Sequence, residues 1–462
     1  MAIPPLLDYP NHLARCFVLA HLSDPAYSFS KFYRSDWGFY PYLGMDASLA
    51  ALLRLFPVET AGRVFLSVCV LALPTAAWFF LRQVNPGEDL TALWALLMAY
   101  NIFFLEGMLN FDLSLAVGFL TLGLWLRWLK HPAAARWIAA LVAFTALYFV
   151  HLLGFGIIGF LVLAYLGFAR RPRRDWFWSG GLVIPGIAFY MYSSRVGLGK
   201  QAVIFRGFGD KLDAIGNLLH SYWPPLEWIS FILIGVFFLA AWWRNPEFRW
   251  SGKWLGVSAS LFVLFLALPW AWGDGSDLDI RVLPVLFVVM FATFRAGRRL
   301  RWLAFIPLVL LAARMVSVSR YFESVQPELR GLALSLDAVP RGALVLPVVE
   351  GDQYPAERPF THFWAYGVIR RGWFSPYLFD LPRETPMRIV YESYVPDGFW
   401  NLAYDREPDW ERVQSDYDYV WAYGVPRFSA GLAEIGDLVY SYGALEVYHI
   451  RKSSVAPGKG PD

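Results

Sequence analysis

The chain alternates between long apolar runs and short polar connections over most of its length. A bilayer span needs about 20 mostly apolar residues, and ten runs approach this length. The fourth and fifth are short enough to form a tight hairpin or a partly re-entrant pair. The pattern therefore predicts ten membrane-spanning helices, at residues 61–81, 90–108, 109–127, 137–151, 152–168, 177–193, 227–243, 254–272, 280–294 and 302–318.

Basic residues gather in alternate connections between these runs, for example in "RRPRR" from Arg170 to Arg174. Because Lys and Arg are enriched in cytoplasmic loops, these connections are predicted to be cytoplasmic. Residues 1–60, the turns near Asn110 and His151, the loop 194–226 and everything after Ser319 then lie outside. An outer segment with no span before it is unusual, so we expect one more apolar helix upstream of Met1 in the natural protein.

The pattern changes after Arg320, where short alternating runs, prolines and charges replace the long apolar stretches. Alternation over four to eight residues is typical of strands. We predict a helix and three strands, at residues 326–339, 342–349, 418–424 and 444–450. The chain is thus expected to have three parts: a periplasmic first-loop segment with interfacial helices (1–60), a transmembrane bundle (61–319) and a small periplasmic α/β domain (320–462).

Composition agrees with a membrane protein and narrows the partners. The 462 residues are 57% hydrophobic and 17% charged, and 22 Trp, 24 Tyr and 38 Phe often stand at the ends of apolar runs. Aromatic rings prefer that interfacial position. The formal net charge of +3 is too small to indicate nucleic-acid binding. Cys16 lies in a polar segment and Cys69 in an apolar run, so no disulfide is expected between them.

Polar residues near the membrane surface carry the candidate chemistry. The first segment, "LDYPNHLARCF", holds Asp8 and His12. Asp8 could be a helix N-cap, or a general base whose direction a neighbouring histidine fixes; the two roles are compatible. Glu106 and Asp112 lie in "FLEGMLNFD". They could bind a divalent metal or position a hydroxyl, or they could cap helix ends at the interface.

Several basic residues on the predicted outer side run against the general charge trend. Lys200 and Arg206 share one loop, and Arg281 follows a group of aspartates. Arginine binds phosphate through charge-assisted, bidentate hydrogen bonds, whereas a structural ion pair with the aspartates is the alternative for Arg281. His151 could contact substrate, cap a helix or meet lipid headgroups. Arg314 lies deep in the last apolar run and must face the bundle, a water-filled cavity or a phosphate.

This arrangement resembles the GT-C superfamily of polyprenyl-phosphate-sugar glycosyltransferases over most of residues 1–320. The resemblance is carried by an acid in the first outer loop, two more acids in the next one, many spans and a periplasmic C-terminal domain, and by the stretches "DYPNHLAR", "YNIFFLEGMLNFDLSLAVGFL" and "DIRVLPVLF". It implies that Asp8 is catalytic and that Glu106 and Asp112 assist, with Asp112 as a ligand if a divalent Mg or Mn ion is used. Tyr9, rather than a second acid, follows Asp8, and the second loop lacks an Asp-x-Asp motif.

The sequence therefore favours a multi-span α-helical membrane protein of the bacterial inner membrane that transfers a sugar from a polyprenyl-phosphate-linked donor. The acceptor is a glycan, a lipid or a protein. Asp8 would be the base, Glu106 would assist, and His12 would orient Asp8. Arg206, Arg281, Lys200 and His151 would contact the phosphate or the rest of the substrate. A lipid or solute transporter and a non-enzymatic membrane scaffold are the alternatives.

Overall fold

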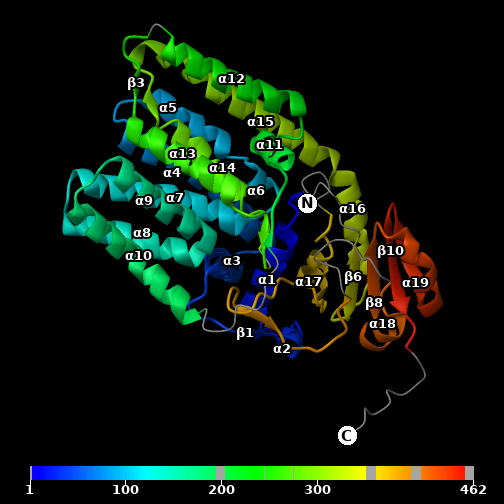
Figure 1. Ribbon diagram of the computed structural model, residues 1–462. Helices are drawn as coiled ribbons and strands as arrows, with labels where there is room; N and C mark the ends of the chain where they lie inside the picture. The colour runs from blue at the N-terminus through cyan, green and yellow to red at the C-terminus, as the bar shows by residue number, and fades with distance from the viewer. Residues whose placement is uncertain are drawn as a thin grey trace. The chain divides into compact units, whose positions relative to one another are not determined.

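The computed structural model describes residues 3–193, 203–243, 245–273, 275–349, 360–396 and 407–452. The described chain is mostly helical, and a small sheet lies in its C-terminal part (Figure 1). This confirms the coarse prediction of a largely helical protein whose C-terminal part contains strands.

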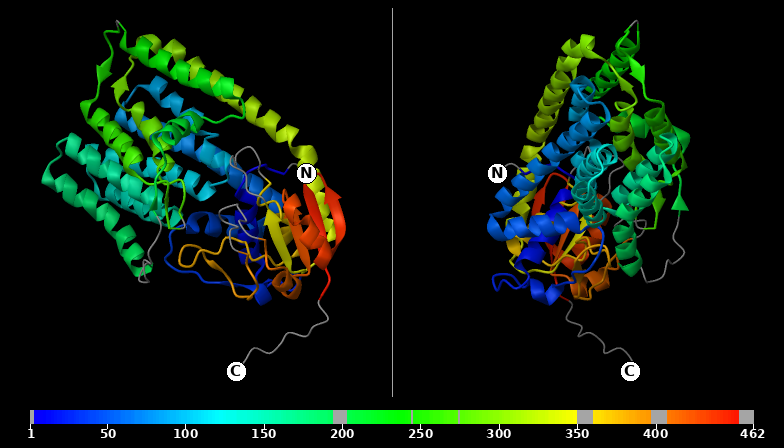
Figure 2. Two further views of the ribbon diagram at one scale, coloured as in Figure 1. Left: turned by 45° about the vertical axis from the view of Figure 1, so that its right-hand side comes forward. Right: turned by 90° about the vertical axis from the view of Figure 1, so that its left-hand side faces the viewer.

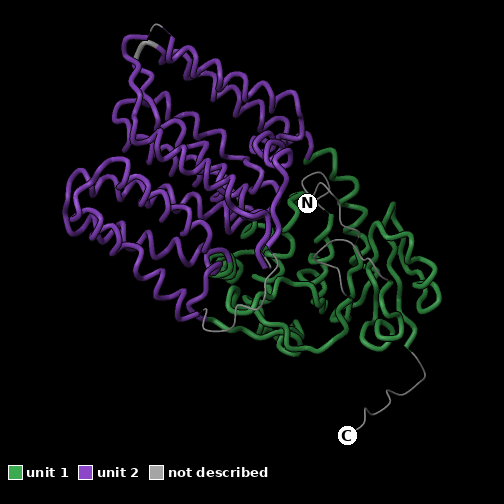
Figure 3. Tube along the Cα trace, in the orientation of Figure 1, with its two compact units in different colours: residues 1–37, 46–62, 322–462 green, residues 38–45, 63–321 purple. Residues whose placement is uncertain are grey.

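Contacts divide the chain into two compact units, which are not consecutive in sequence (Figure 3). Unit 1 consists of residues 1–37, 46–62 and 322–462, and unit 2 of residues 38–45 and 63–321. The N-terminal segment therefore belongs to the same unit as the C-terminal sheet, whereas the sequence pattern divided the chain into three successive parts. The difference arises because the two segments share buried contacts that no local pattern reveals.

Four helices in the described residues are long and apolar enough to cross a membrane: α4 (Val58–Val84), α7 (Leu109–Lys130), α12 (Pro224–Trp242) and Leu300–Ser324, which includes α15 (Phe305–Ser324). Shorter apolar helices occupy much of five other predicted spans. The remaining α-helices and strands of unit 2 are α5 (Asp89–Leu93), α6 (Ile102–Leu105), α8 (Ala134–Val150), α9 (Leu152–Phe168), α10 (Arg173–Ser193), α11 (Phe208–Asn217), α13 (Gly252–Ala267), α14 (Leu283–Met290), β2 (Val203–Ile204), β3 (Arg249–Trp250), β4 (Ala271–Trp272) and β5 (Phe294–Arg295).

Helix α7 is the most enclosed of the four long helices, with 78% of its apolar window buried against 28–39% in the others. It packs against α8 and α9, and these helices lie side by side in Figures 1 and 2. Gly154 of α9 brings its backbone close to the Ser114 side chain of α7. The other three helices leave many apolar side chains outside the protein core, as a lipid-facing surface requires.

Unit 1 contains a four-stranded sheet in the order β6-β8-β10-β9, with β6 and β8 parallel and the other pairs antiparallel. Strands β6 (Val345–Val349), β8 (Tyr419–Tyr423) and β10 (Leu445–Ile450) and helix α16 (Gln326–Ser335) confirm the sequence prediction. The edge strand β9 (Gly436–Tyr442) was not predicted. Helix α16 covers the sheet, and the Trp421 indole N–H donates to the Ser335 hydroxyl at 3.0 Å.

The N-terminal segment is bound into unit 1 by buried polar contacts. Arg15 of α1 (Tyr9–His21) donates two hydrogen bonds to Asp46 of α3 (Leu43–Leu55), at 2.8 and 3.0 Å, and both side chains are fully buried. Burial, together with the Asp46 carboxylate beside it, raises the pKa of the Cys16 thiol well above its usual value. The other elements of unit 1 are α2 (Phe29–Phe32), α17 (Ala365–Arg371), α18 (Trp410–Asp416), α19 (Ser429–Ile435) and the paired strands β1 (Tyr33–Ser35) and β7 (Met387–Ile389).

Candidate functional site

Asp8 stands at the N-cap position of α1, where the backbone enters the helix just before Pro10. Its side chain makes no capping hydrogen bond, although carboxylates at this position usually accept one. Instead, Asp8 Oδ1 lies 3.4 Å from His362 Nε2. The Asp8 side chain is 21% exposed and His362 is buried, so the carboxylate contacts a buried histidine and keeps partial access to solvent.

Asn11 fixes the orientation and tautomer of His362. The Asn11 side-chain oxygen accepts from the Phe379 backbone N–H at 2.9 Å, and its amide nitrogen donates to the Tyr377 carbonyl at 2.9 Å. The same amide nitrogen lies 3.3 Å from His362 Nδ1. Because an amide nitrogen can only donate, Nδ1 must accept, and the proton of the neutral ring is on Nε2. His362 therefore directs an N–H at Asp8.

His12, which the sequence predicted to orient Asp8, has a different environment. Its ring packs edge-on against Phe379 at 4.9 Å, and its Nδ1 atom is buried without a hydrogen-bond partner among the described residues. Burial lowers the pKa of His12 well below its usual value, and the positive charge of Arg15 and the nearby His362 lower it further. The contact with Asp8 that was expected of His12 is made by His362.

Sequence reasoning missed both His362 and Asn11 as members of this site. Asn11 follows Asp8 by three positions, so the two residues share one face at the start of a helix; this spacing was a usable signal. His362 carries no such signal, because it is 351 residues from Asn11 and stands alone in "FTHFW". The resulting Asp8–His362–Asn11 chain can accept a proton from a hydroxyl at Asp8 while the imidazole N–H holds the carboxylate in place.

A second polar cluster forms around Arg281 in unit 2. Arg281 Nη1 lies 3.1 Å from His151 Nε2, Nη2 contacts the Met108 sulfur at 3.6 Å, and the guanidinium stands over the Phe111 ring at 5.2 Å. Arg281 Nε is buried and has no hydrogen-bond partner among the residues that the structure describes. No carboxylate pairs with Arg281 in the described part of the chain, so the ion pair considered from the sequence is not formed by those residues.

The contact between Arg281 and His151 leaves hydrogen-bond donors without an acceptor. His151 Nδ1 accepts from the backbone N–H of Leu153 at 3.2 Å, so the proton of the neutral ring is on Nε2. That N–H then faces the Arg281 guanidinium, which is also only a donor. His151 is 4% exposed, so water does not easily separate them. The two nitrogens are in direct contact, and an anion placed beside them could accept hydrogen bonds from both, which is the chemistry expected of a phosphate contact.

The other predicted phosphate ligand, Arg206, is already paired. It forms an ion pair with Asp277 and lies 3.8 Å from Asp279. Lys211 also pairs with Asp279, at 2.9 Å, and donates to two backbone carbonyls. These four residues form a partly buried ionic network that joins α11 to the segment before α14. Their charges compensate one another, so this network is less suited than Arg281 to receive an anion.

Two further basic residues were singled out from the sequence. Lys200 lies outside the described residues. Arg314 faces the interior of the bundle, where it donates to the backbone carbonyls of Leu219, Tyr100 and His220, the last two at 2.7 and 3.2 Å. The Arg314 guanidinium therefore serves as a hydrogen-bond donor to these three backbone carbonyls in unit 2.

The two acids of the second outer turn differ in their environments. Glu106 is the half-buried residue that ends α6, and Asp112 is buried in the first turn of α7. The Asp112 carboxylate accepts from the Asn101 amide at 2.6 Å, and Asn101 itself caps α6. No group of three or more His, Cys, Asp or Glu side chains could hold a metal ion within the described ranges. A divalent ion at Asp112 stays a prediction of the resemblance, since one or two carboxylates with substrate phosphates can also hold such an ion.

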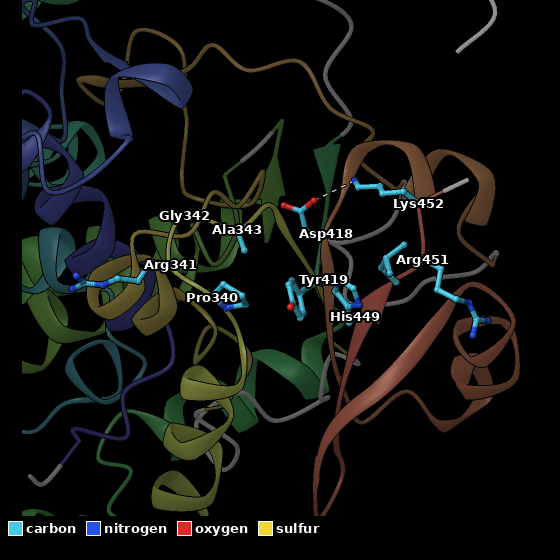
Figure 4. Close-up of a pocket in the computed structure, with 10 residues that line it drawn as sticks. Pro340, Arg341, Gly342, Ala343, Asp418, Tyr419, His449, Arg451 and Lys452 are labelled. Carbon is cyan, nitrogen blue, oxygen red and sulfur yellow. Dashed lines mark ion pairs between the residues drawn. The ribbon is translucent and has the colours of Figure 1, made fainter. Parts of the chain in front are cut away.

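A shallow pocket of about 400 Å³ lies where β6 and β8 begin, with Pro340, Tyr419 and His449 along its wall (Figure 4). Among the charged side chains drawn there, Asp418 and Lys452 pair with each other at 3.2 Å. Asp418 also accepts from the Leu344 backbone N–H at 3.0 Å. The pocket contains none of the residues predicted as catalytic or phosphate-binding.

Searches with protein-family profiles, among curated proteins and among solved structures found no match for this chain. The interpretation of both clusters consequently depends on their geometry.

Proposed function

We propose that the protein is a membrane glycosyltransferase of the GT-C type, which moves a sugar from a polyprenyl-phosphate-linked donor to a glycan, lipid or protein acceptor. In this proposal the reaction takes place at the periplasmic face of a bacterial inner membrane, within a multi-span bundle, and the C-terminal sheet is periplasmic. The four long apolar helices support a membrane location, which a lipid-linked donor requires.

The proposed reaction needs a base and a positive charge. The acceptor hydroxyl gives its proton to Asp8 while its oxygen bonds to the anomeric carbon of the sugar. The bond between that carbon and the phosphate oxygen breaks, and the lipid phosphate leaves as an anion. A phosphate leaving group needs no protonation, so stabilising its negative charge is sufficient.

The observation that carries the proposal is the position of the Asp8 carboxylate. It stands at a helix N-cap but does not cap the helix, and a histidine of fixed tautomer points an N–H at one of its oxygens. A carboxylate that served only the helix end would bond to the free backbone N–H groups of the first turn. The arrangement found is the one that orients a general base.

The Arg281–His151 cluster supports the choice of a phosphate-containing donor. It presents several N–H groups without an acidic partner among the described residues. In contrast, the transporter alternative relied on Arg314 as the polar group deep in a span, and Arg314 is occupied by three backbone carbonyls. Arg314 is thus less available to a transported solute, which supports the transferase proposal over transport.

Native mass spectrometry of the detergent-purified protein tests the donor. We expect a co-purified polyprenyl phosphate or its sugar conjugate, lost on Arg281→Ala and retained in the control Arg82→Ala, which removes a surface ion pair of α4. The mass of the conjugate identifies the sugar. A wild-type protein that binds no such lipid even after its addition, or an Arg281→Ala variant that binds it normally, contradicts the proposal.

The same purified donor allows a transfer assay in membranes. Removing a general base typically lowers the rate by about 10²- to 10⁴-fold, and we expect a loss of this size for Asp8→Asn. His362→Gln should lower the rate less, because the carboxylate remains. Asp337→Asn, at an exposed acid of unit 1, is the control. Full transfer activity in Asp8→Asn would exclude the role given to Asp8.

A further inference from the structure

A second pocket, of about 420 Å³, lies within unit 1 at the opposite end of α1 from Asp8. Its walls are the last turns of α1, the loop that follows, the connection between α3 and α4, and the end of α17. The lining side chains include Phe17, His21, Asp24, Tyr27, Phe56 and Arg370. The pocket volume is within the range of small-molecule sites, which is about 300–1,000 Å³.

Aromatic rings form a rigid part of this pocket. The Phe17 and His21 rings stack at 4.1 Å, and Tyr27 meets both edge-on, at 5.3 and 5.8 Å. Tyr27 is in turn stacked on Phe29 at 4.8 Å with the two planes almost parallel. Phe56 is 44% exposed, so its ring is accessible to a ligand in the pocket.

Polar groups of both hydrogen-bonding types accompany these rings. His21 Nδ1 lies 3.0 Å from the Phe17 carbonyl; because a carbonyl only accepts, Nδ1 carries the proton and Nε2 is left as an acceptor. Asp24 Oδ1 accepts from the Ala26 backbone N–H at 2.9 Å, which fixes the loop. Arg370 is exposed and supplies N–H donors.

These features select one class of ligand. A lipid tail would leave the polar groups unsatisfied, and an inorganic anion would meet the Asp24 carboxylate and would not use the rings. A sugar ring presents apolar C–H faces to aromatic rings and hydroxyls that both donate and accept. We propose that this pocket binds a pyranose ring.

The location of the pocket indicates which part of the substrate this sugar would belong to. Asp8 precedes the first turn of α1 and His21 ends it, and a helix of 13 residues is about 20 Å long. A sugar in the pocket is therefore not the one that reacts at Asp8. If the proposed transferase function holds, it is a remote sugar of an extended glycan acceptor, whose binding energy helps to position the reacting hydroxyl.

Saturation-transfer difference NMR on the detergent-purified, full-length protein tests the pocket without any transfer reaction. The probes are methyl pyranosides of glucose, galactose, mannose, N-acetylglucosamine and glucuronic acid. We expect at least one to bind, with signals strongest from one face of the ring. Phe56→Ala and Tyr27→Ala should each weaken its binding roughly fivefold or more, the effect of losing one aromatic contact.

Two controls separate this proposal from the others. Leu55→Ala changes an exposed neighbour of Phe56 that does not line the pocket and should leave binding unchanged. Asp8→Asn should lower the transfer rate as stated above while sugar binding persists, so failure of the catalytic proposal and failure of the pocket proposal are distinguishable. The pocket proposal is overturned if none of the five glycosides binds, or if the signals survive both aromatic substitutions.

Discussion

In both clusters a single hydrogen bond determines which nitrogen of a histidine carries the proton. Asn11 has its oxygen occupied by a backbone N–H, and this one contact determines which nitrogen of His362 carries the proton. In the same way, the Leu153 N–H determines the tautomer of His151. Neither could be predicted from the sequence, because the partners come from distant positions or from the backbone. Asp8, Arg281 and His151 could be singled out because a charge or a histidine beside apolar runs is conspicuous.

His12 makes the stability of the protein depend on pH. Its pKa is lowered by burial in the folded state, whereas the unfolded chain binds the proton below about pH 6.5. The stability associated with the neutral ring is therefore present in full above pH 6.5 and is lost as the pH falls toward the lowered pKa. The slope is at most about 1.4 kcal/mol per pH unit. Melting temperatures measured between pH 7.5 and 5 should fall less steeply in His12→Gln.

His131→Gln is the matched control, because His131 is exposed at the end of α7 and its removal should keep the wild-type slope. An unchanged slope in His12→Gln would show that His12 is not the residue responsible.

At the level of elements, local patterns predicted the buried strands well and the edge strand poorly. Val420, Trp421 and Ala422 of β8 are all buried and read as a continuous apolar run. Strand β9 leaves Leu438 and Val439 exposed, so it shows no clear inward face and depends on its pairing with β10. Helix α7 was recognisable from its length, but its central place in unit 2 follows from packing that hydropathy does not record.

Two glycines of α9, which packs against α7, should respond in opposite directions when they are replaced by alanine. A Cβ atom at Gly154 would lie 2.3 Å from Ser114 Oγ, whereas a Cβ at Gly156, two positions further on, meets no atom within 4 Å. Gly154→Ala should therefore destabilise the protein by about 1–3 kcal/mol through overpacking. Gly156→Ala should be neutral or stabilising by up to about 1 kcal/mol, because alanine favours the helix. Thermal unfolding in detergent measures both, and equal effects would contradict the packing described.

On the scale of the whole molecule, the four long apolar helices predict integral membrane association. We expect the protein to stay in the membrane pellet after an alkaline carbonate wash, which strips proteins held only by surface charge, and to be released by detergent. Recovery in the alkaline supernatant would show that the apolar helices are buried among themselves and do not span the bilayer.

Unit 1 is built from segments at both ends of the chain, so the proposed site cannot form until the C-terminal segment has been synthesised. Asn11 and His362 are 351 residues apart, and a ribosome adds roughly 5–20 residues per second. The ribosome therefore adds His362 on the order of half a minute after Asp8. An unfinished or C-terminally clipped chain that retains every apolar helix would lack this partner. Under the proposed function, a nascent chain could therefore be inserted in the membrane well before its Asp8–His362 pair is complete.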